Sequence, residues 1–213
     1  MTNRVSVWVA TVALLAALAV VLDLLRIKVH YPLLPFLTFN LSEIPVVLAF
    51  LLLGFKAGMV VAFAQWFTLN LGIPFQPGVG PLMKLLAVTS MLVGLYLGGG
   101  FWRRGGPLKG RHVALMTALG ALVRVSVMAL ATFMLYYIIF PERYLSFAGK
   151  VLGNVLGLQV ESALLLTLIM VALTSLFNLL HTPLSVIPAA AIYKAYLRAT
   201  GRQPALEEPQ RRA

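Results

Sequence analysis

Long uncharged apolar segments recur along this chain and constrain its fold more than any other feature. Val5 to Leu22, Leu85 to Trp102, Val125 to Pro141 and Ser162 to Tyr193 contain no lysine, arginine, aspartate or glutamate. At ~1.5 Å rise per residue, ~20 such residues cross the ~30 Å hydrocarbon core of a bilayer. Hydrophobic residues make up 61% of the chain and charged residues 11%, against ~45–50% and ~25% in soluble domains. We therefore predict an all-α integral membrane protein located in the cell membrane.

Proline and glycine divide the remaining apolar sequence. A cluster of these residues between Gly72 and Pro81 marks a loop after a helix that ends near Leu71. Gly54-Phe55-Lys56 allows a tight reversal between two helices. The sequence thus predicts a bundle of six transmembrane helices, at about 6–25, 43–54, 56–71, 80–101, 112–140 and in a last segment ending near 198.

The last segment leaves an ambiguity, because its 32 uncharged residues would extend to ~48 Å as one helix. Pro183 and Pro188 can kink a helix. Residues 160–180 are therefore expected to form either a separate span or an extended helical connection at the outer face.

Basic residues indicate the orientation. With six spans and both termini in the cytoplasm, eleven lysines and arginines fall on the inner side and four, Arg26, Lys28, Arg143 and Lys150, on the outer side. A seventh span would move five of the eleven inner basic residues to the outer side, against the positive-inside rule. Residues 1–200 then form one substrate-binding membrane domain, and 201–213 a polar cytoplasmic tail that we expect to be disordered.

A cleavable signal peptide is the alternative interpretation of the first segment. Arg4 precedes the apolar run, and Ala17-Leu18-Ala19 is similar to a cleavage site. The run is longer than a usual signal sequence, and its removal would leave five spans, so a retained helix is preferred.

Composition also bears on the function class. The net charge of +11 would suggest nucleic acid in a soluble protein, but in a membrane protein it reflects topology. The absence of cysteine excludes disulfides and thiolate metal sites. His30, His112 and His181 lack metal-ligand spacing, and no reactive pair of carboxylates or serine with a base is evident. We expect no enzyme activity, no cofactor and no metal.

Polar residues instead gather at the outer ends of the predicted helices. Gln65, Lys84, Asn178 and His181 are candidates for a ligand pocket, because polar groups are costly to bury in hydrocarbon. The loop at 28–40 is too apolar to be free in water, so we expect it to pack over the outer mouth of the bundle.

Structural roles remain open for the same residues. Lys84 can snorkel to headgroups, and His181 can be a satisfied core histidine. Arg124 can pair with Asp23. Glu43 can favour the positive end of a helix that starts at Ser42-Glu43-Ile44-Pro45.

Two motifs carry a family resemblance. Leu37-Thr38-Phe39-Asn40-Leu41-Ser42-Glu43-Ile44-Pro45, followed by Leu52-Leu53-Gly54-Phe55-Lys56-Ala57-Gly58, resembles the substrate-binding S components of energy-coupling factor (ECF) vitamin transporters. The riboflavin-binding branch is the most similar. Gly78-Val79-Gly80-Pro81 and Phe177-Asn178-Leu179-Leu180 agree with it.

The resemblance implies a protein that captures a vitamin-like small molecule at the outer face and joins a transmembrane coupling protein and two cytoplasmic ATPases. It assigns ligand binding to Leu37, Thr38, Phe39 and Asn40. It also assigns contact with the coupling protein to alanines four residues apart in the first helix, here Ala13 and Ala17. This small-xxx-small spacing lets helices approach closely. The chain has no Walker motif, as expected if partners hydrolyse ATP.

Three positions differ from the riboflavin branch. Asn40 stands where that branch has an aspartate, and His181 stands where it has a lysine. Near Leu135 this chain has an apolar residue where that branch has a polar one. Another vitamin or heterocyclic precursor therefore stays open as the substrate. A stand-alone secondary transporter, or less favourably a membrane-embedded enzyme, also stays open, although neither an internal repeat nor a reactive constellation is found.

Overall fold

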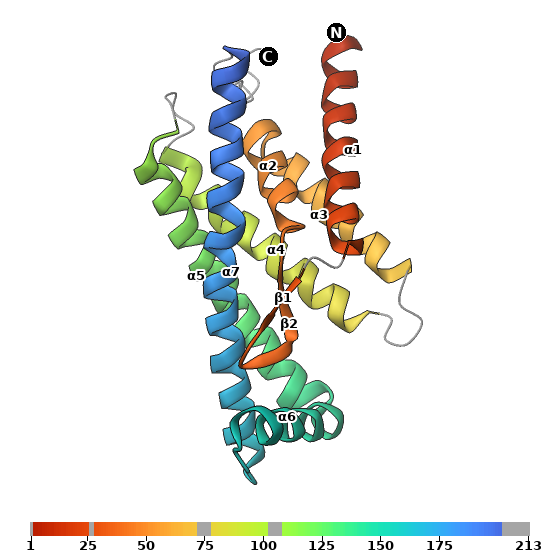
Figure 1. The fold of residues 1–213 in the computed structure, drawn as a ribbon, viewed down its shortest axis with the longest axis vertical. Helices are drawn as coiled ribbons and strands as arrows, with labels where there is room; N and C mark the ends of the chain where they lie inside the picture. Colours follow the sequence, from red (N-terminus) through yellow and green to blue (C-terminus); the bar gives the residue numbers. More distant parts are fainter. Residues whose placement is uncertain (1, 26–27, 72–77, 102–107, 202–213) are drawn as a thin grey trace, which may run out of the picture.

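The computed structural model of the protein describes residues 2–25, 28–71, 78–101 and 108–201, and it is mostly helical (Figure 1). Seven α-helices lie in these ranges: α1 (Thr2–Leu24), α2 (Glu43–Leu53), α3 (Phe55–Leu71), α4 (Val79–Gly98), α5 (Gly110–Phe133), α6 (Pro141–Leu156) and α7 (Ala163–Thr200). A 3₁₀ turn, η1 (Gly99–Phe101), follows α4, and a π-helical stretch, η2 (Met134–Ile139), extends α5. All but the first residue of the predicted tail at 201–213 lies outside the described residues.

The distribution of apolar surface is that of a membrane protein. Four helices of the described chain are long and apolar enough to cross a bilayer, namely Val5–Leu24 of α1, α4, Gly110–Ile139 and α7. Large apolar side chains face outward, for example Leu14 at 70% exposure and Leu71 at 73%. Polar side chains such as Glu43 and Arg124 lie inside. An exterior this apolar, with charged side chains placed inside the bundle, requires lipid rather than water outside.

The predicted helices at 6–25, 43–54, 56–71, 80–101 and 112–140 correspond to α1 through α5 with η1 and η2. The tight reversal predicted at Gly54-Phe55-Lys56 takes a single residue, Gly54, whose φ of 90° favours glycine. α2 and α3 are shorter than the four candidate spans.

The all-α prediction is wrong in one segment. The connection between α1 and α2 forms an antiparallel hairpin of β1 (Lys28–Tyr31) and β2 (Leu34–Asn40), in which His30 faces Thr38 and Lys28 faces Asn40. Pro32 and Pro35 disfavour a helix there, and strand pairing satisfies backbone groups in an apolar setting.

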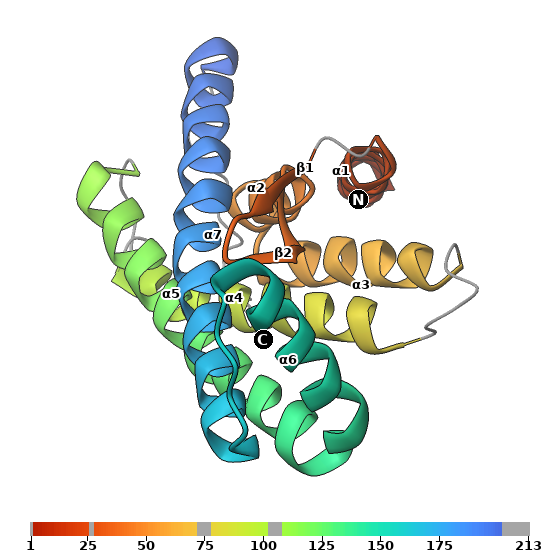
Figure 2. The same ribbon diagram turned by 60° about the horizontal axis from the view of Figure 1, so that its bottom comes forward.

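Two alternatives were left open for residues 160–180, a separate span and a helical connection at the outer face, and the structure differs from both. A separate helix, α6, starts with Pro141 and ends at Leu156, and the next residue, Gly157, has a left-handed conformation. α7 is then one continuous helix of 38 residues that includes Pro183 and Pro188. Residues 163–180 therefore extend the last helix rather than forming a separate span. Figures 1 and 2 show α6 lying across one end of α7.

Glycines bring α4 and α5 into close contact. A Cβ built on Gly94 would lie 2.3 Å from the carbonyl oxygen of Leu119, and one on Gly98 would lie 2.7 Å from the Cα of Met116. Only glycine permits this approach, as at small-xxx-small crossings in membranes.

The interior is divided into two apolar clusters. One joins α1, α2, α3, α4, α5 and α7 and includes Val46, Leu92 and Tyr193. The other joins the hairpin, η2, α6 and α7 and includes Leu34 and Met170. The first turn of α1 and the last turn of α7 lie at the same end of the molecule, at the top of Figure 1, and α6 lies at the opposite end.

Candidate functional site

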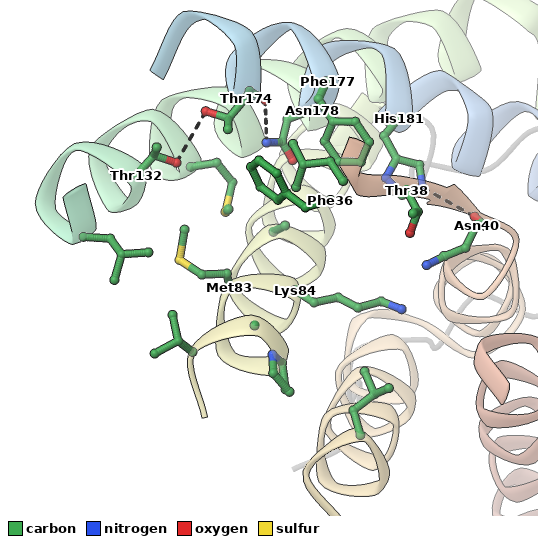
Figure 3. A pocket seen from close by; sticks show the side chains of 18 of the residues that line it. Phe36, Thr38, Asn40, Met83, Lys84, Thr132, Thr174, Phe177, Asn178 and His181 are labelled. Carbon is green, nitrogen blue, oxygen red and sulfur yellow. Dashed lines mark hydrogen bonds between the residues drawn. The ribbon is translucent and has the colours of Figure 1, made fainter. Parts of the chain in front are cut away.

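A cavity of about 630 Å³ lies among α4, α5, α6, α7 and the hairpin. Its size falls in the ~300–1,000 Å³ range of small-molecule sites. Figure 3 shows side chains from β2, α4, α5 and α7 around the cavity, with Lys84 reaching along one side and Asn178 and His181 on another.

Two helices each contribute one face to the wall. On α5, Arg124, Met128 and Thr132 are spaced by four residues, and on α7, Thr174 and Asn178 follow the same spacing. Residues four apart share a helix face. The hydroxyl of Thr174 donates to Oγ1 of Thr132 at 3.5 Å across the two helices, as marked in Figure 3.

A buried ion pair closes one side of the cavity. The guanidinium of Arg124 donates to both carboxylate oxygens of Glu43, at 2.7 and 3.0 Å. These side chains are 2% and 1% exposed. The pair joins α5 to the first turn of α2, and its bidentate geometry is the strongest form of such a contact.

The surrounding side chains occupy the other donors of Arg124. Its Nε donates to Oδ1 of Asn178 at 2.9 Å, and its Nη2 lies 3.3 Å from Nδ1 of His181. The hydroxyl of Ser185 donates to the Glu43 carboxylate at 2.9 Å. Three residues of α7 thus fix a pair formed by two other helices.

A second polar network lies around Lys84. Its ammonium donates to Oδ1 of Asp23 at 2.6 Å and to the hydroxyl of Ser42 at 2.9 Å. Gln65 donates to the other carboxylate oxygen of Asp23 at 2.6 Å, and Ser42 donates to Oδ1 of Asn40 at 2.7 Å. This network ties α1, α3 and α4 to the end of the hairpin.

Aromatic rings cover another part of the wall. Phe36 of the hairpin meets Phe147 of α6 edge to face at 5.1 Å, and both line the cavity with Tyr144 and Phe177. Burial raises the pKa of the Tyr144 phenol, so it remains a hydrogen-bond donor at neutral pH. The wall therefore offers flat apolar surfaces opposite the polar networks.

Most of the predicted binding residues meet at this cavity. Its wall contains Leu37, Thr38, Asn40, Lys84, Asn178 and His181.

Phe39 and Gln65 are not among the lining residues. Phe39 stacks on Phe177 at 4.7 Å and meets His181 edge to face at 5.5 Å, so it supports the wall from behind. Gln65 is 2% exposed and holds Asp23. Their assignment to ligand binding stays a prediction.

The charge pairs differ from the pairing considered for the sequence. Arg124 pairs with Glu43 rather than Asp23, and Asp23 pairs with Lys84. Sequence reasoning also missed the wall residues of α6, because α6 itself was not predicted. The regular spacing of Arg124, Met128 and Thr132 was the available signal for the α5 face.

The alanines expected at a partner interface face outward. Ala13 and Ala17 are exposed on α1, whereas Val12 and Leu15 of the same helix are buried. Among the described residues, no group of three or more histidine, aspartate or glutamate side chains is arranged to hold a metal ion.

Comparison of the sequence with protein-family models and with curated proteins gave no match. A solved structure does match: the S component of a bacterial ECF transporter superposes with a TM-score of 0.63. The match covers 95% of this chain and 100% of that chain, at 24% sequence identity. The chain therefore shares the fold of that S component.

Proposed function

We propose that this chain is the substrate-capture subunit of an ECF-type importer. It binds a vitamin or another heterocyclic micronutrient in the cavity beneath the hairpin, at the outer face of the membrane. A transmembrane coupling protein and two cytoplasmic ATPases then drive uptake, so the chain itself is not an enzyme. The observation that carries the proposal is a ligand-sized cavity, walled by charged and aromatic residues, within an S-component fold.

The chemistry of the cavity favours capture over catalysis. The carboxylates that line it, Asp23 and Glu43, are each held in an ion pair, and neither is left as a free base. The aromatic wall suits a planar ring, since stacking on Phe36 or Tyr144 adds to burial. Riboflavin is the first compound to test, because the sequence motifs are most similar to the riboflavin-binding branch.

Co-purification tests the partners. The full chain, tagged and extracted from its native membrane in mild detergent, should retain one multi-span protein and two ATPases with Walker motifs. Uptake of the captured compound into proteoliposomes should require that complex and ATP. Ion-gradient-driven uptake by the chain alone would instead assign it to secondary transport.

The same proposal places both termini and Lys109 in the cytoplasm and α6 outside. The chain contains no cysteine, so single cysteines give a clean background. In intact cells an impermeant maleimide should label Lys150→Cys and spare Lys109→Cys. The reverse pattern would refute the orientation and an outward-facing cavity.

A further inference from the structure

Each carboxylate at the cavity is already paired with a cation of the protein. Both oxygens of Asp23 accept hydrogen bonds, one from Lys84 and the other from Gln65. Both oxygens of Glu43 accept from Arg124, and one of them also accepts from Ser185. The negative groups of the wall are thus committed to the protein itself, and a cationic ligand would find no free counter-ion among the described residues.

The cations at the cavity are in excess. Four line it, namely Lys28, Lys84, Arg124 and Arg143, against the two carboxylates. Lys84 and Arg124 hold those carboxylates. Lys28 of β1 and Arg143 of α6 are exposed, and no carboxylate of the described residues forms an ion pair with either. The wall therefore carries two positive charges without a protein counter-ion.

The wall also carries N–H and O–H groups that can donate to a ligand. Oδ1 of Asn40 accepts from Ser42, whereas its amide nitrogen has no partner among the described residues. Lys84 has three N–H donors and uses two of them. The Tyr144 phenol lies on the same wall. A ligand that fills the cavity must supply acceptors for these groups, because an unpaired buried donor is costly.

From this imbalance we propose that the captured molecule is an anion: a planar ring compound that bears a carboxylate or phosphate. The acidic group is held by the charges of Lys28 and Arg143, and the ring lies against the aromatic wall formed by Phe36, Tyr144 and Phe147. This inference rests on the proposed function and narrows its substrate class.

Matched pairs of probes test the charge of the ligand. Binding to the purified full chain in detergent is titrated for nicotinamide and nicotinate, pyridoxine and pyridoxine 5′-phosphate, and riboflavin and riboflavin 5′-phosphate. Small molecules retained by the chain are released by denaturation and identified by mass spectrometry. The variant Lys28→Gln/Arg143→Gln is compared with Lys150→Gln, which removes a charge of α6 that does not line the cavity.

The anionic member of at least one pair should bind the wild type more tightly than its neutral partner. The double variant should weaken that anion roughly five- to fiftyfold and leave the neutral partner within about twofold. Lys150→Gln should change neither. A carboxylate probe and a phosphate probe that differ in affinity identify which acid is held.

Two results would overturn the inference while leaving substrate capture intact. These are a retained compound that is neutral or cationic, and neutral probes that bind as tightly as their acids. A chain that retains no small molecule and binds none of the six probes would refute substrate capture itself, and the anion with it.

Discussion

The Arg124–Glu43 pair should be strongly coupled in the stability of the protein. Both side chains are at most 2% exposed, and two hydrogen bonds of 2.7 and 3.0 Å join them. Replacing either partner with an apolar residue, as in Arg124→Met or Glu43→Leu, leaves the other as an uncompensated buried charge. Each change should cost about 3–5 kcal/mol of unfolding free energy.

The variant with both replacements should lose far less unfolding free energy than the two single variants lose together. Removing both charges leaves only neutral groups of Asn178, His181 and Ser185 with lost partners, at about 1–3 kcal/mol each where they find no replacement. We therefore expect a total of about 2–5 kcal/mol, compared with about 6–10 kcal/mol for independent effects.

Unfolding by dodecyl sulfate in mixed micelles, followed by far-ultraviolet circular dichroism, measures all four corners of this double-mutant cycle. Lys150→Gln serves as the control for an exposed charge and should be neutral. If the loss in the double variant equals the sum of the two single losses to within about 0.5 kcal/mol, the two residues are independent and the coupling is refuted.

Three further predictions concern other parts of the molecule. Ala13→Leu/Ala17→Leu should abolish ATP-driven uptake while ligand binding to the isolated chain stays unchanged, since both positions are exposed on α1; a parallel loss of binding would show that they pack internally. Gly94→Ala should destabilise the protein by about 1–3 kcal/mol in the same unfolding titration, because its Cβ would lie 2.3 Å from a backbone oxygen. The control Gly149→Ala, which meets open space in α6, should gain up to about 1 kcal/mol, and equal effects at the two glycines would contradict the close crossing. His181→Ala should weaken binding of the captured compound roughly five- to a hundredfold with the fold retained, because it removes a polar group of the wall; unchanged affinity would make this histidine a core residue only.

The sequence was informative where apolar length and chain breakers decide the structure. α2 and α3 were expected at 43–54 and 56–71, and the structure has them at Glu43–Leu53 and Phe55–Leu71. Gly54 marked the reversal because few other residues adopt its conformation. Asn178 and His181 were predicted to be pocket residues because polar groups are costly to bury in hydrocarbon, and both line the cavity.

The hairpin and α6 were missed for different reasons. The hairpin segment is apolar and rich in proline and aromatics, and its strand pairing depends on the helices around it. α6 carries three charges within ten residues, Glu142, Arg143 and Lys150. The segment therefore contains no long uncharged stretch of the kind that predicts a span. An amphipathic helix of this kind lies along an interface instead of crossing it.

The ion pairs could not be read from the sequence, because their partners are far apart in the chain. Glu43 and Arg124 are separated by 81 positions, and Asp23 and Lys84 by 61. Helical spacing identifies which residues share a face, but not which faces of different helices meet. Asp23 was therefore as reasonable a partner for Arg124 as Glu43.

The short length of α2 changes how deep the bound compound lies. Its 11 residues rise only about 16 Å, roughly half the ~30 Å thickness of the hydrocarbon core. Glu43 at its first turn borders the cavity, and Gly54 at its other end begins the return into α3. In the proposed orientation, with the cavity open to the outside, the layer beneath the site is about half the thickness of the hydrocarbon core. A compound bound there would have only that layer left to cross on its release.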